Sequence, residues 1–564
     1  MNLWTVTTFI FFTALVAVIS WYMTRKEDLS TNKGYFLAGR SLKGGVIAGS
    51  LLLTNLSAEQ LVGLNGNGFS GGLLAMHWEI ISGITMVFMA LIFLPRYLKS
   101  GYTTVPEFLE QRYDKQTRNI VTALFLISLT FVTLPIVLYA GGLAINSLFN
   151  VPEMLGVSNS TSLFIVIAAT GIVGGIYAIF GGLKAVAVSD TINGVGLVIG
   201  GVMIPVLGLI KLGGGSFLAG LNQLIVNHPE KMNAVTGPGN PPFVTIFTGI
   251  ILVNTFYWCT NQQIVQRTFA AVNLKEGQKG VLIGAFLKVA GSFILVIPGI
   301  IAYHLYGSEI GHQDLAYAYL VGRVLPTGLV GFFGAVVFGA VLSSFNSALN
   351  SASTMFCINI FKPIFNTSVS DEKLVKIGKI FGTVVCIFSI FVAPQIANAP
   401  TGLYDFMRSV MGFFNIPTLA VVLMGFATKY VPAIGAKIAI AFFMISYSLY
   451  TFVFDIPIHF LHVFGILFVG CIIIMLVAGK IKPRETPYVQ IDVGAVDLTS
   501  WKYAKPISAV VCITIVYAYV VFSPIGIINY ENYLPRLGII SLIYAIITII
   551  AWIIVKKVTK VTKF

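Results

Sequence analysis

Long apolar stretches recur along the whole chain and restrict its fold more than any other feature. A membrane-crossing helix needs about 20 predominantly apolar residues. The stretches that meet this length are residues 3–23, 44–71, 72–95, 119–147, 162–180, 187–210, 243–266, 280–306, 326–360, 376–397, 404–427, 434–453, 457–478, 507–523 and 536–555. Only 10% of the residues are charged, against about 25% in soluble domains. We therefore expect an all-α polytopic membrane protein with about 15 transmembrane spans, and a cytosolic enzyme is excluded.

The basic residues predict the orientation of these spans. Lys and Arg accumulate in cytoplasmic loops, and with the N-terminus outside, alternate loops hold 29 of the 35 basic residues. The opposite loops hold four, and Lys288 and Arg408 fall inside spans. We expect a multi-pass protein of the plasma (inner) membrane, with its N-terminus outside and residues 556–564 in the cytoplasm.

Polar residues interrupt the second apolar stretch at its centre. Thr54, Asn55, Ser57, Glu59 and Gln60 follow one another there, and glycines come shortly after. Such side chains compete with the backbone for hydrogen bonds, so we predict a helix that is broken near residues 53–60. Broken helices in membranes line cavities and hold substrate and ion in secondary transporters. A kinked structural helix is the alternative.

Two charged residues lie in otherwise apolar spans and are candidates for a buried pair. Glu79 and Ser82 are three residues apart in the third span and share a helix face. Lys288 lies too deep in the eighth span to reach water, so it needs an anionic or polar partner, for which Glu79 is one candidate. Glu79 either locks two helices together or contacts a substrate.

The seventh and ninth spans each carry a stripe of polar residues. Asn254, Tyr257, Trp258 and Asn261 follow helical spacing, and amides beside aromatic faces suit a hydroxylated ring. The ninth span repeats this spacing with small residues: Ala340, Ser343, Ser344 and Ser347. Hydroxyls opposite the free carbonyls of a broken helix are ligands for a hard cation, and Na⁺ is the obvious one. Ordinary helix packing is the alternative for both stripes.

Asp190 opens the sixth predicted span, where it is either a helix N-cap or a source of negative charge for a cation site. Membrane enzymes share this composition, but they need a catalytic grouping such as paired Asp, Ser with His, or H-E-x-x-H. The sequence contains no such grouping, so we do not expect an enzyme.

Several longer motifs resemble the sodium:solute symporter family, in particular the branch of sodium/glucose and sodium/galactose cotransporters. The motifs are GYFLAGRSL at 34–42, SLLLTNLSAEQLVGLNGNG, PRYLKSGYTTVPEFLEQRYD, FYWCTNQQIVQRTFAA and AVLSSFNSALNSAST. They occur in one order between about residues 30 and 430, which makes the resemblance specific.

The resemblance implies a five-plus-five inverted-repeat, LeuT-like core with extra helices. The parts it predicts are an extra helix and cytoplasmic loop at 1–43, a first repeat at 44–211, an extracytoplasmic connector at 212–242, a second repeat at 243–428 and extra helices at 429–564.

It also implies roles for individual residues. The sodium site would use the carbonyls of Leu53, Leu56 and Ala340 and the hydroxyls of Ser343 and Ser344. A second sodium would lie near Asp190, Asn346 and Ser347, although Asn346 stands where a hydroxyl is expected. Substrate would bind at Gln60, Glu79, Ser82, Asn254 and Lys288, with gates at Leu64, Trp78, Tyr257 and Tyr404.

Arg408 departs from this branch, whose members carry Gln in the corresponding span. A guanidinium offers a bidentate fork for carboxylate or sulfate, so Arg408 is a further candidate substrate contact. Asp405, three residues earlier, could instead pair with it. A neutral sugar or polyol is favoured as the substrate, and an anionic sugar is the second candidate.

These features together predict a sodium-coupled symporter that imports a sugar or sugar derivative by alternating access. Na⁺ is the coupling ion, and the partners are a small sugar-type molecule and the lipid bilayer, with no nucleic acid and no obligate protein partner. The alternative is a proton-coupled or sodium-independent carrier of sugars or organic acids, with Glu79 or Asp190 as the titrating group.

Overall fold

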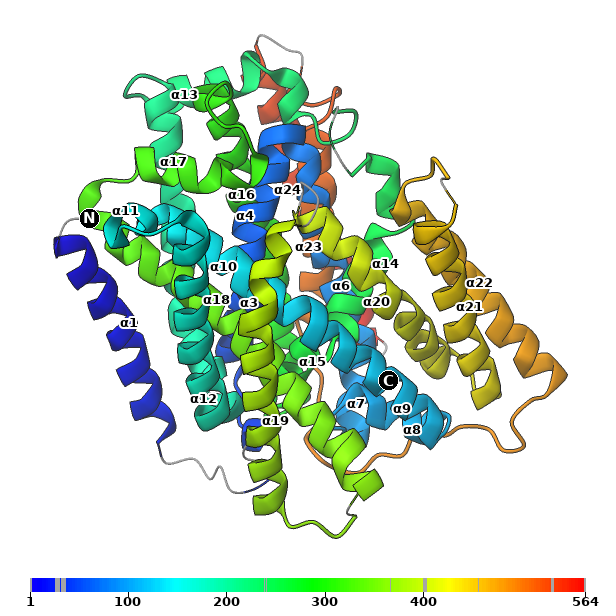
Figure 1. Ribbon diagram of the computed structural model, residues 1–564. Helices are drawn as coiled ribbons and strands as arrows, with labels where there is room; N and C mark the ends of the chain where they lie inside the picture. Colours follow the sequence, from blue (N-terminus) through cyan, green and yellow to red (C-terminus); the bar gives the residue numbers. More distant parts are fainter. Residues whose placement is uncertain are drawn as a thin grey trace.

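The fold is an all-helical bundle that places two interrupted helices at its centre (Figure 1). The computed structural model describes residues 3–25, 31, 37–237, 239, 241–365, 367–398, 403–454, 456–528 and 532–561. Parts of the predicted cytoplasmic segments 24–43 and 556–564, including the start of the GYFLAGRSL motif, lie outside the described residues.

The helices of the bundle differ widely in length. Those up to residue 269 are α1 (Leu3–Thr24), α3 (Gly44–Asn55), α4 (Ala58–Gly71), α5 (His77–Ile80), α6 (Ser82–Phe88), α7 (Leu94–Ser100), α8 (Val105–Arg112), α9 (Lys115–Ile127), α10 (Leu134–Leu148), α11 (Val151–Leu155), α12 (Asn159–Leu212), α13 (Phe217–Val226), α14 (Ile250–Cys259) and α15 (Gln262–Phe269). Those that follow are α16 (Leu274–Tyr306), α17 (Ala316–Val324), α18 (Thr327–Met355), α19 (Asp371–Val392), α20 (Leu403–Ala427), α21 (Ala433–Phe452), α22 (Phe460–Ile481), α23 (Ala504–Val521) and α24 (Leu534–Val561).

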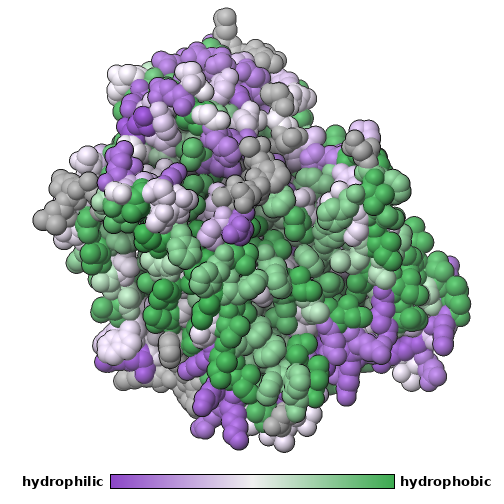
Figure 2. All heavy atoms as spheres, viewed as in Figure 1, coloured by the Kyte–Doolittle hydropathy of each residue, from purple (hydrophilic) through white to green (hydrophobic). Residues whose placement is uncertain are grey.

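The surface carries a broad apolar band between two hydrophilic ends (Figure 2). Among the described residues, 13 helical stretches are long and apolar enough to cross a membrane. A band of this kind is what a bilayer requires, because its core offers no hydrogen bonds to polar groups. The chain is therefore a multi-pass membrane protein.

The difference between 15 predicted spans and 13 membrane-length helices arises at two interrupted segments. The predicted span 44–71 is divided into α3 and α4, and α4 continues through short turns into the stretch that ends at Ser100. The predicted span 243–266 is divided into α14 and α15. Apolar length alone could not reveal either division, because each segment as a whole is long enough to be one span.

The interrupted helices lie at the centre of the bundle and the terminal helices lie at its edge. α3 packs against α12, α16 and α18, and α4 packs against α16. α1 runs along one edge of the view in Figure 1, and α21 and α22 form the opposite edge. The spanning stretch of α24 buries none of its residues inside the structure, whereas that of α18 buries 72%. Polar residues of the central helices therefore face protein and not lipid.

Side-chain caps fix where several helices begin at the ends of the bundle. Thr104 and Glu107 form a reciprocal capping box at the start of α8. Asp114 accepts the backbone N–H of Thr117 at the start of α9, and Asn273 accepts that of Glu276 at the start of α16. These caps satisfy donors that a helix leaves unpaired in its first turn.

The close approach of α4 and α16 depends on two glycines. A Cβ on Gly299 would lie 1.9 Å from the Asn65 carbonyl oxygen, and one on Gly68 would lie 2.5 Å from the Val296 carbonyl oxygen. The backbone N–H of Gly299 also donates to Asn65 Oδ1 at 3.0 Å. Small residues allow this close packing of backbones. Inside a membrane such packing holds helices together, because the hydrophobic effect does not drive their association there.

Gly299→Ala is expected to lower the stability of the protein. The added methyl group has no room against α4, and overpacking of this kind costs about 1–3 kcal/mol. Thermal unfolding of the detergent-solubilised protein measures the loss. Gly322→Ala on α17 is the matched control, since nothing lies within 4 Å of a Cβ there. Equal melting temperatures for the two variants would contradict the packing argument.

Candidate functional site

The break between α3 and α4 falls at Leu56 and Ser57, inside the predicted stretch 53–60. In a continuous α-helix, the N–H groups of Ser57 and Gln60 would donate to the carbonyls four residues earlier. Here they donate to the carbonyls of Asn55 at 2.8 Å and Ser57 at 3.2 Å. The carbonyl oxygens of Leu53 and Leu56 are thereby released from these helical bonds.

The hydroxyl stripe of α18 faces this break. Ser344 Oγ donates to the Thr54 carbonyl at 3.2 Å, and Ser347 Oγ lies 3.5 Å from Thr54 Oγ1. Ser343 Oγ is buried and has no hydrogen-bond partner among the described residues. Ala340 is fully buried one turn before Ser344. Carbonyl and hydroxyl oxygens are the donor set that a hard cation requires.

A second interrupted helix, which we did not predict, lies in the seventh span. α14 ends at Cys259, and Asn261 then caps α15 by accepting the N–H of Gln263. The expected single stripe from Asn254 to Asn261 is therefore wrong, because Asn261 stands outside the helix that carries Asn254. Asn is a strong N-cap residue, and this preference was the available signal. The two breaks lie at the starts of the two predicted repeats.

Asp190 is the centre of a buried polar network. It lies inside α12 and not at a helix start, so the N-cap interpretation is wrong. Its Oδ2 accepts hydrogen bonds from Ser50 at 2.9 Å, Thr54 at 3.4 Å and Arg267 Nη2 at 3.1 Å. Its Oδ1 has no hydrogen-bond partner among the described residues. The carboxylate thus already holds one cationic group, which comes from the protein itself.

Arg267 of α15 is the functional candidate that the sequence analysis missed. We counted it among the basic residues of a cytoplasmic loop, but its side chain is fully buried. Besides Asp190, its guanidinium donates to Ser50 Oγ at 2.7 Å and to Ser347 Oγ. The sequence contains one indication of this role: Arg267 is the single charged residue in a motif of apolar and amide residues, shortly after the helix cap at Asn261. Arg267 occupies the position next to Ser347 where we expected a second sodium.

Asn346, the third residue of that predicted second sodium site, stands apart from this network. Its side chain is buried on α18, and its Oδ1 has no hydrogen-bond partner among the described residues. It lines a small cavity of about 70 Å³ together with Ser343 and residues of α1 and α12.

Glu79 and Lys288 form a buried ion pair, as the sequence suggested. Lys288 Nζ also donates to Asn55 Oδ1, at the end of α3. Gln60 Nε2 donates to the other carboxylate oxygen of Glu79 at 2.8 Å. The pair therefore ties the broken helix to α5 and α16, and the charges compensate each other in surroundings where either alone would be costly.

Ser82 and Asn254 form a separate polar contact. Ser82 Oγ donates to Asn254 Oδ1 at 2.7 Å, and Asn254 Nδ2 donates to the Ile250 carbonyl at 3.1 Å. Both side chains are buried. Five of the six predicted substrate residues thus lie in two small networks, each of which includes an interrupted helix.

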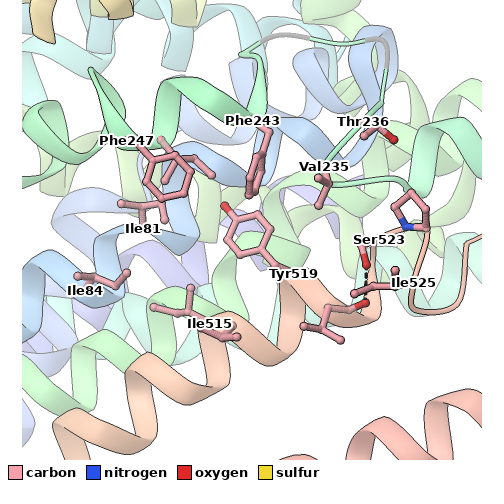
Figure 3. Close-up of a pocket in the computed structure, with 14 residues that line it drawn as sticks. Ile81, Ile84, Val235, Thr236, Phe243, Phe247, Ile515, Tyr519, Ser523 and Ile525 are labelled. Atoms are coloured by element: carbon pink, nitrogen blue, oxygen red, sulfur yellow. Dashed lines mark hydrogen bonds between the residues drawn. The ribbon is translucent and has the colours of Figure 1, made fainter.

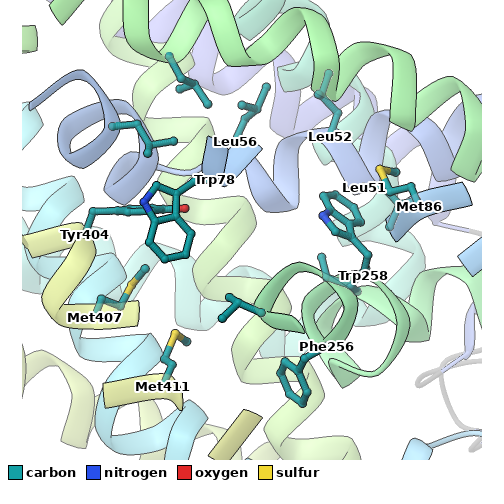
Figure 4. Close-up of a cluster of buried hydrophobic side chains, with 14 of the residues drawn as sticks. Leu51, Leu52, Leu56, Trp78, Met86, Phe256, Trp258, Tyr404, Met407 and Met411 are labelled. Atoms are coloured by element: carbon teal, nitrogen blue, oxygen red, sulfur yellow. The ribbon is translucent and has the colours of Figure 1, made fainter. Parts of the chain in front are cut away.

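Arg408 is the remaining predicted substrate residue, and three of the predicted gating residues surround it. Its guanidinium carbon lies 5.8 Å, 5.7 Å and 4.7 Å from the ring centroids of Trp78, Tyr257 and Tyr404. Figure 4 shows Trp78 beside Tyr404, whose ring centroids are 5.6 Å apart. The structure thus brings together side chains from α5, α14 and α20 around one buried cation, an arrangement that cation–π attraction stabilises.

Leu64, the fourth predicted gate, lies on α4 one turn after Gln60 and is fully buried. The neighbouring Gly63 packs directly on Tyr404, because a Cβ added to Gly63 would lie 2.7 Å from the Tyr404 Cβ. This face of α4 therefore lies against α20.

Two apolar grooves of the described surface contain none of the residues of these networks in their linings. One, of about 580 Å³, has no charged residue in its lining, and Phe243, Phe247 and Tyr519 form part of its wall (Figure 3). A groove of this composition offers few polar groups to orient a polar solute.

Comparison with known proteins identifies the family. Residues 35–442 match the sodium:solute symporter family, so the chain belongs to it. YidK, an uncharacterized symporter of Escherichia coli (strain K12), is 49% identical over 98% of this chain and 96% of its own length. The sodium/glucose cotransporter of Vibrio parahaemolyticus is 31% identical over 77% of this chain and 82% of its own length.

The fold comparison agrees with this family. A solved Na⁺-coupled sialic acid symporter in a substrate-bound outward-open state superposes with a TM-score of 0.74 at 19% identity, covering 86% of this chain and 99% of that chain. The core is LeuT-like. The protein is therefore a sodium-coupled solute symporter, a transporter and not an enzyme, and Na⁺ is its cosubstrate.

The Asp190–Arg267 pair is expected to behave as one unit in a double-mutant cycle. Asp190→Asn or Arg267→Gln alone leaves one buried charge without its partner, which costs about 3–5 kcal/mol. The double variant removes both charges and should recover much of that loss. Thermal unfolding of the four proteins measures the coupling, and additive losses would contradict it.

Proposed function

We propose that the protein imports a sugar or sugar derivative together with Na⁺ by alternating access. The released carbonyls of Leu53 and Leu56, on either side of the Thr54 residue whose carbonyl accepts the Ser344 hydroxyl, carry this proposal. Na⁺ bound there would join the broken α3–α4 segment to α18 and favour the outward-open state. Substrate would then bind, and the bundle would rock inward and release both.

A hydroxylated solute is supported by the residues next to the break. The side chains of Gln60 and Asn254 are hydrogen-bonding amides, and Trp78 and Tyr257 supply aromatic faces. Amides bond hydroxyl groups and aromatic faces cover the C–H side of a ring. The similarity to a sodium/glucose cotransporter supports the same solute class and the sodium/glucose and sodium/galactose branch.

One sodium ion per cycle is the stoichiometry that we propose. Asp190 and Ser347, which would hold a second ion, already contact the fixed guanidinium of Arg267. A mobile cation there would have to approach a fixed positive charge. For a neutral solute one ion is sufficient, because inward movement of the charge yields about 2.3 kcal/mol per 100 mV, and a tenfold gradient adds about 1.4 kcal/mol.

Proton coupling is the weaker alternative. Glu79 is paired with Lys288 and Asp190 with Arg267. Each carboxylate already has a cation of the protein as its charge partner, so protonation during transport would leave that cation buried and unpaired.

We also propose a topology and a repeat organisation. The N-terminus lies outside and the C-terminus lies in the cytoplasm. The two repeats span residues 44–211 and 243–428, with the connector at 212–242 and the extra helices at 1–43 and 429–564.

Ser344→Ala should raise the sodium concentration that half-maximally stabilises the protein by about tenfold. The hydroxyl is a proposed ion ligand, and a tenfold change in sodium affinity corresponds to a loss of about 1.4 kcal/mol. Thermal unfolding in NaCl, with choline chloride replacing it at constant ionic strength, measures the change. Ser353→Ala is the control, since Ser353 lies on the same helix but contacts Gly382 of α19. An unchanged sodium requirement in Ser344→Ala would refute the site.

Radiolabelled sodium is expected to bind purified wild-type protein with one site per chain and without cooperativity. The physical reason is the Arg267 guanidinium beside Asp190. Equilibrium binding at several sodium concentrations gives the number of sites. Two saturable sites per chain would show that Arg267 does not exclude the second ion.

A further inference from the structure

Arg408 is a buried cation inside a membrane span. It is 8% exposed on α20, within the stretch Tyr404–Ala427. A charged side chain at this depth is costly and marks a functional site by default. Its aromatic neighbours Trp78 and Tyr257 come from α5 and α14, the elements that carry Glu79 and Asn254. Arg408 therefore lies at the edge of the proposed substrate site.

Unlike Lys288 and Arg267, Arg408 forms no ion pair with a carboxylate among the described residues. Lys288 pairs with Glu79, and Arg267 pairs with Asp190. Arg408 Nη2 instead donates to the neutral Tyr404 hydroxyl at 2.6 Å, and its buried Nε–H has no hydrogen-bond acceptor in the described part of the chain.

The two nearest acidic residues do not supply the missing partner. Asp405 Oδ1 accepts a hydrogen bond from Asn67 Nδ2 at 3.3 Å. Asp405 interacts with Arg408 electrostatically but forms no ion pair with it within 4.0 Å, so the direct pairing that the sequence left open is not formed. Glu59 interacts with Arg408 electrostatically but forms no ion pair with it within 4.0 Å. A guanidinium is thus left with a free donor facing an aromatic enclosure.

The chemistry of that donor selects a class of ligand. A desolvated guanidinium binds carboxylate and sulfate groups through strong, paired hydrogen bonds, and its planar fork fits them better than a single hydroxyl. A buried cation that forms no ion pair is also costly until a counter-ion binds it directly. A neutral sugar would leave this cost in place, whereas an anionic group would remove it.

We propose that the transported solute carries an oxyanion, either a carboxylate or a sulfate ester, and that Arg408 binds this group. The hydroxyl groups of the solute contact Gln60 and Asn254. This proposal rests on the proposed sodium symport and names its substrate class. It has one further consequence: a monoanion that enters with one Na⁺ moves no net charge. Its import would then depend on the sodium gradient and not on the membrane potential.

Matched pairs of sugars test the proposal on the full-length protein in detergent at saturating NaCl. The pairs are glucuronate with glucose, galacturonate with galactose, and glucose 6-sulfate with glucose. The melting temperature, measured over a range of ligand concentrations, gives an apparent affinity for each probe. We expect at least one acidic member to bind about tenfold or more tightly than its neutral counterpart. The carboxylate and sulfate pairs show which oxyanion is preferred.

Variants locate the effect at Arg408. Arg408→Gln should abolish the preference for the acid, and Arg408→Lys, which keeps the charge but loses the fork, should retain part of it. Arg323→Gln, at an exposed arginine of α17, should retain all of it. Stabilisation by NaCl alone shows that each variant is folded, because the proposed sodium ligands do not include Arg408.

Three results would overturn the proposal: neutral sugars that bind as tightly as their acids, wild-type affinity for the acid in Arg408→Gln, or no acid that binds sodium-loaded protein. In each case stabilisation of the wild type by sodium would leave the symport proposal intact. Absence of any stabilisation by sodium would instead contradict the symport proposal itself.

Discussion

Backbone polar groups cannot be left without partners inside a bilayer, and this constraint organises the whole structure. Where α3 gives way to α4, the helical bonds to Leu53 and Leu56 are lost. Lipid could not satisfy the released carbonyls, so the surrounding helices α12, α16 and α18 must enclose them. The break is therefore buried at the centre of the bundle, and the oxygen atoms it exposes are available to an ion.

Buried charges hold the elements around this break in place. Lys288 and Glu79 connect α16 and α5 to the end of α3, and Arg267 connects α15 to α12 and α18. Both pairs compensate charge in low-dielectric surroundings and restrict how the helices can be arranged. Arg408 stands apart, since the described residues give it aromatic faces and a hydroxyl but no ion pair with a carboxylate.

The sequence predicted the membrane fold, the first break and the Glu79–Lys288 pair because each has a local signal: apolar length, clustered polar residues, or a lone charge in an apolar span. It missed the second break, because Asn261 looks like one more polar residue at helical spacing. It also missed the role of Arg267, because a basic residue near a predicted span end is indistinguishable from a loop residue until tertiary contacts bury it. That Asp405 contacts Asn67 likewise depends on the packing of α20 on α4.

The central claim is that oxygen atoms of the α3–α4 break and of α18 enclose Na⁺. The most direct measurement compares high-resolution cryo-electron microscopy maps of the protein in NaCl and in choline chloride. The account predicts a density between the carbonyls of Leu53 and Leu56 and the hydroxyl of Ser344 in sodium, and its loss in choline. A continuous helix through Leu56, or a sodium-dependent density elsewhere with none at this position, would contradict it.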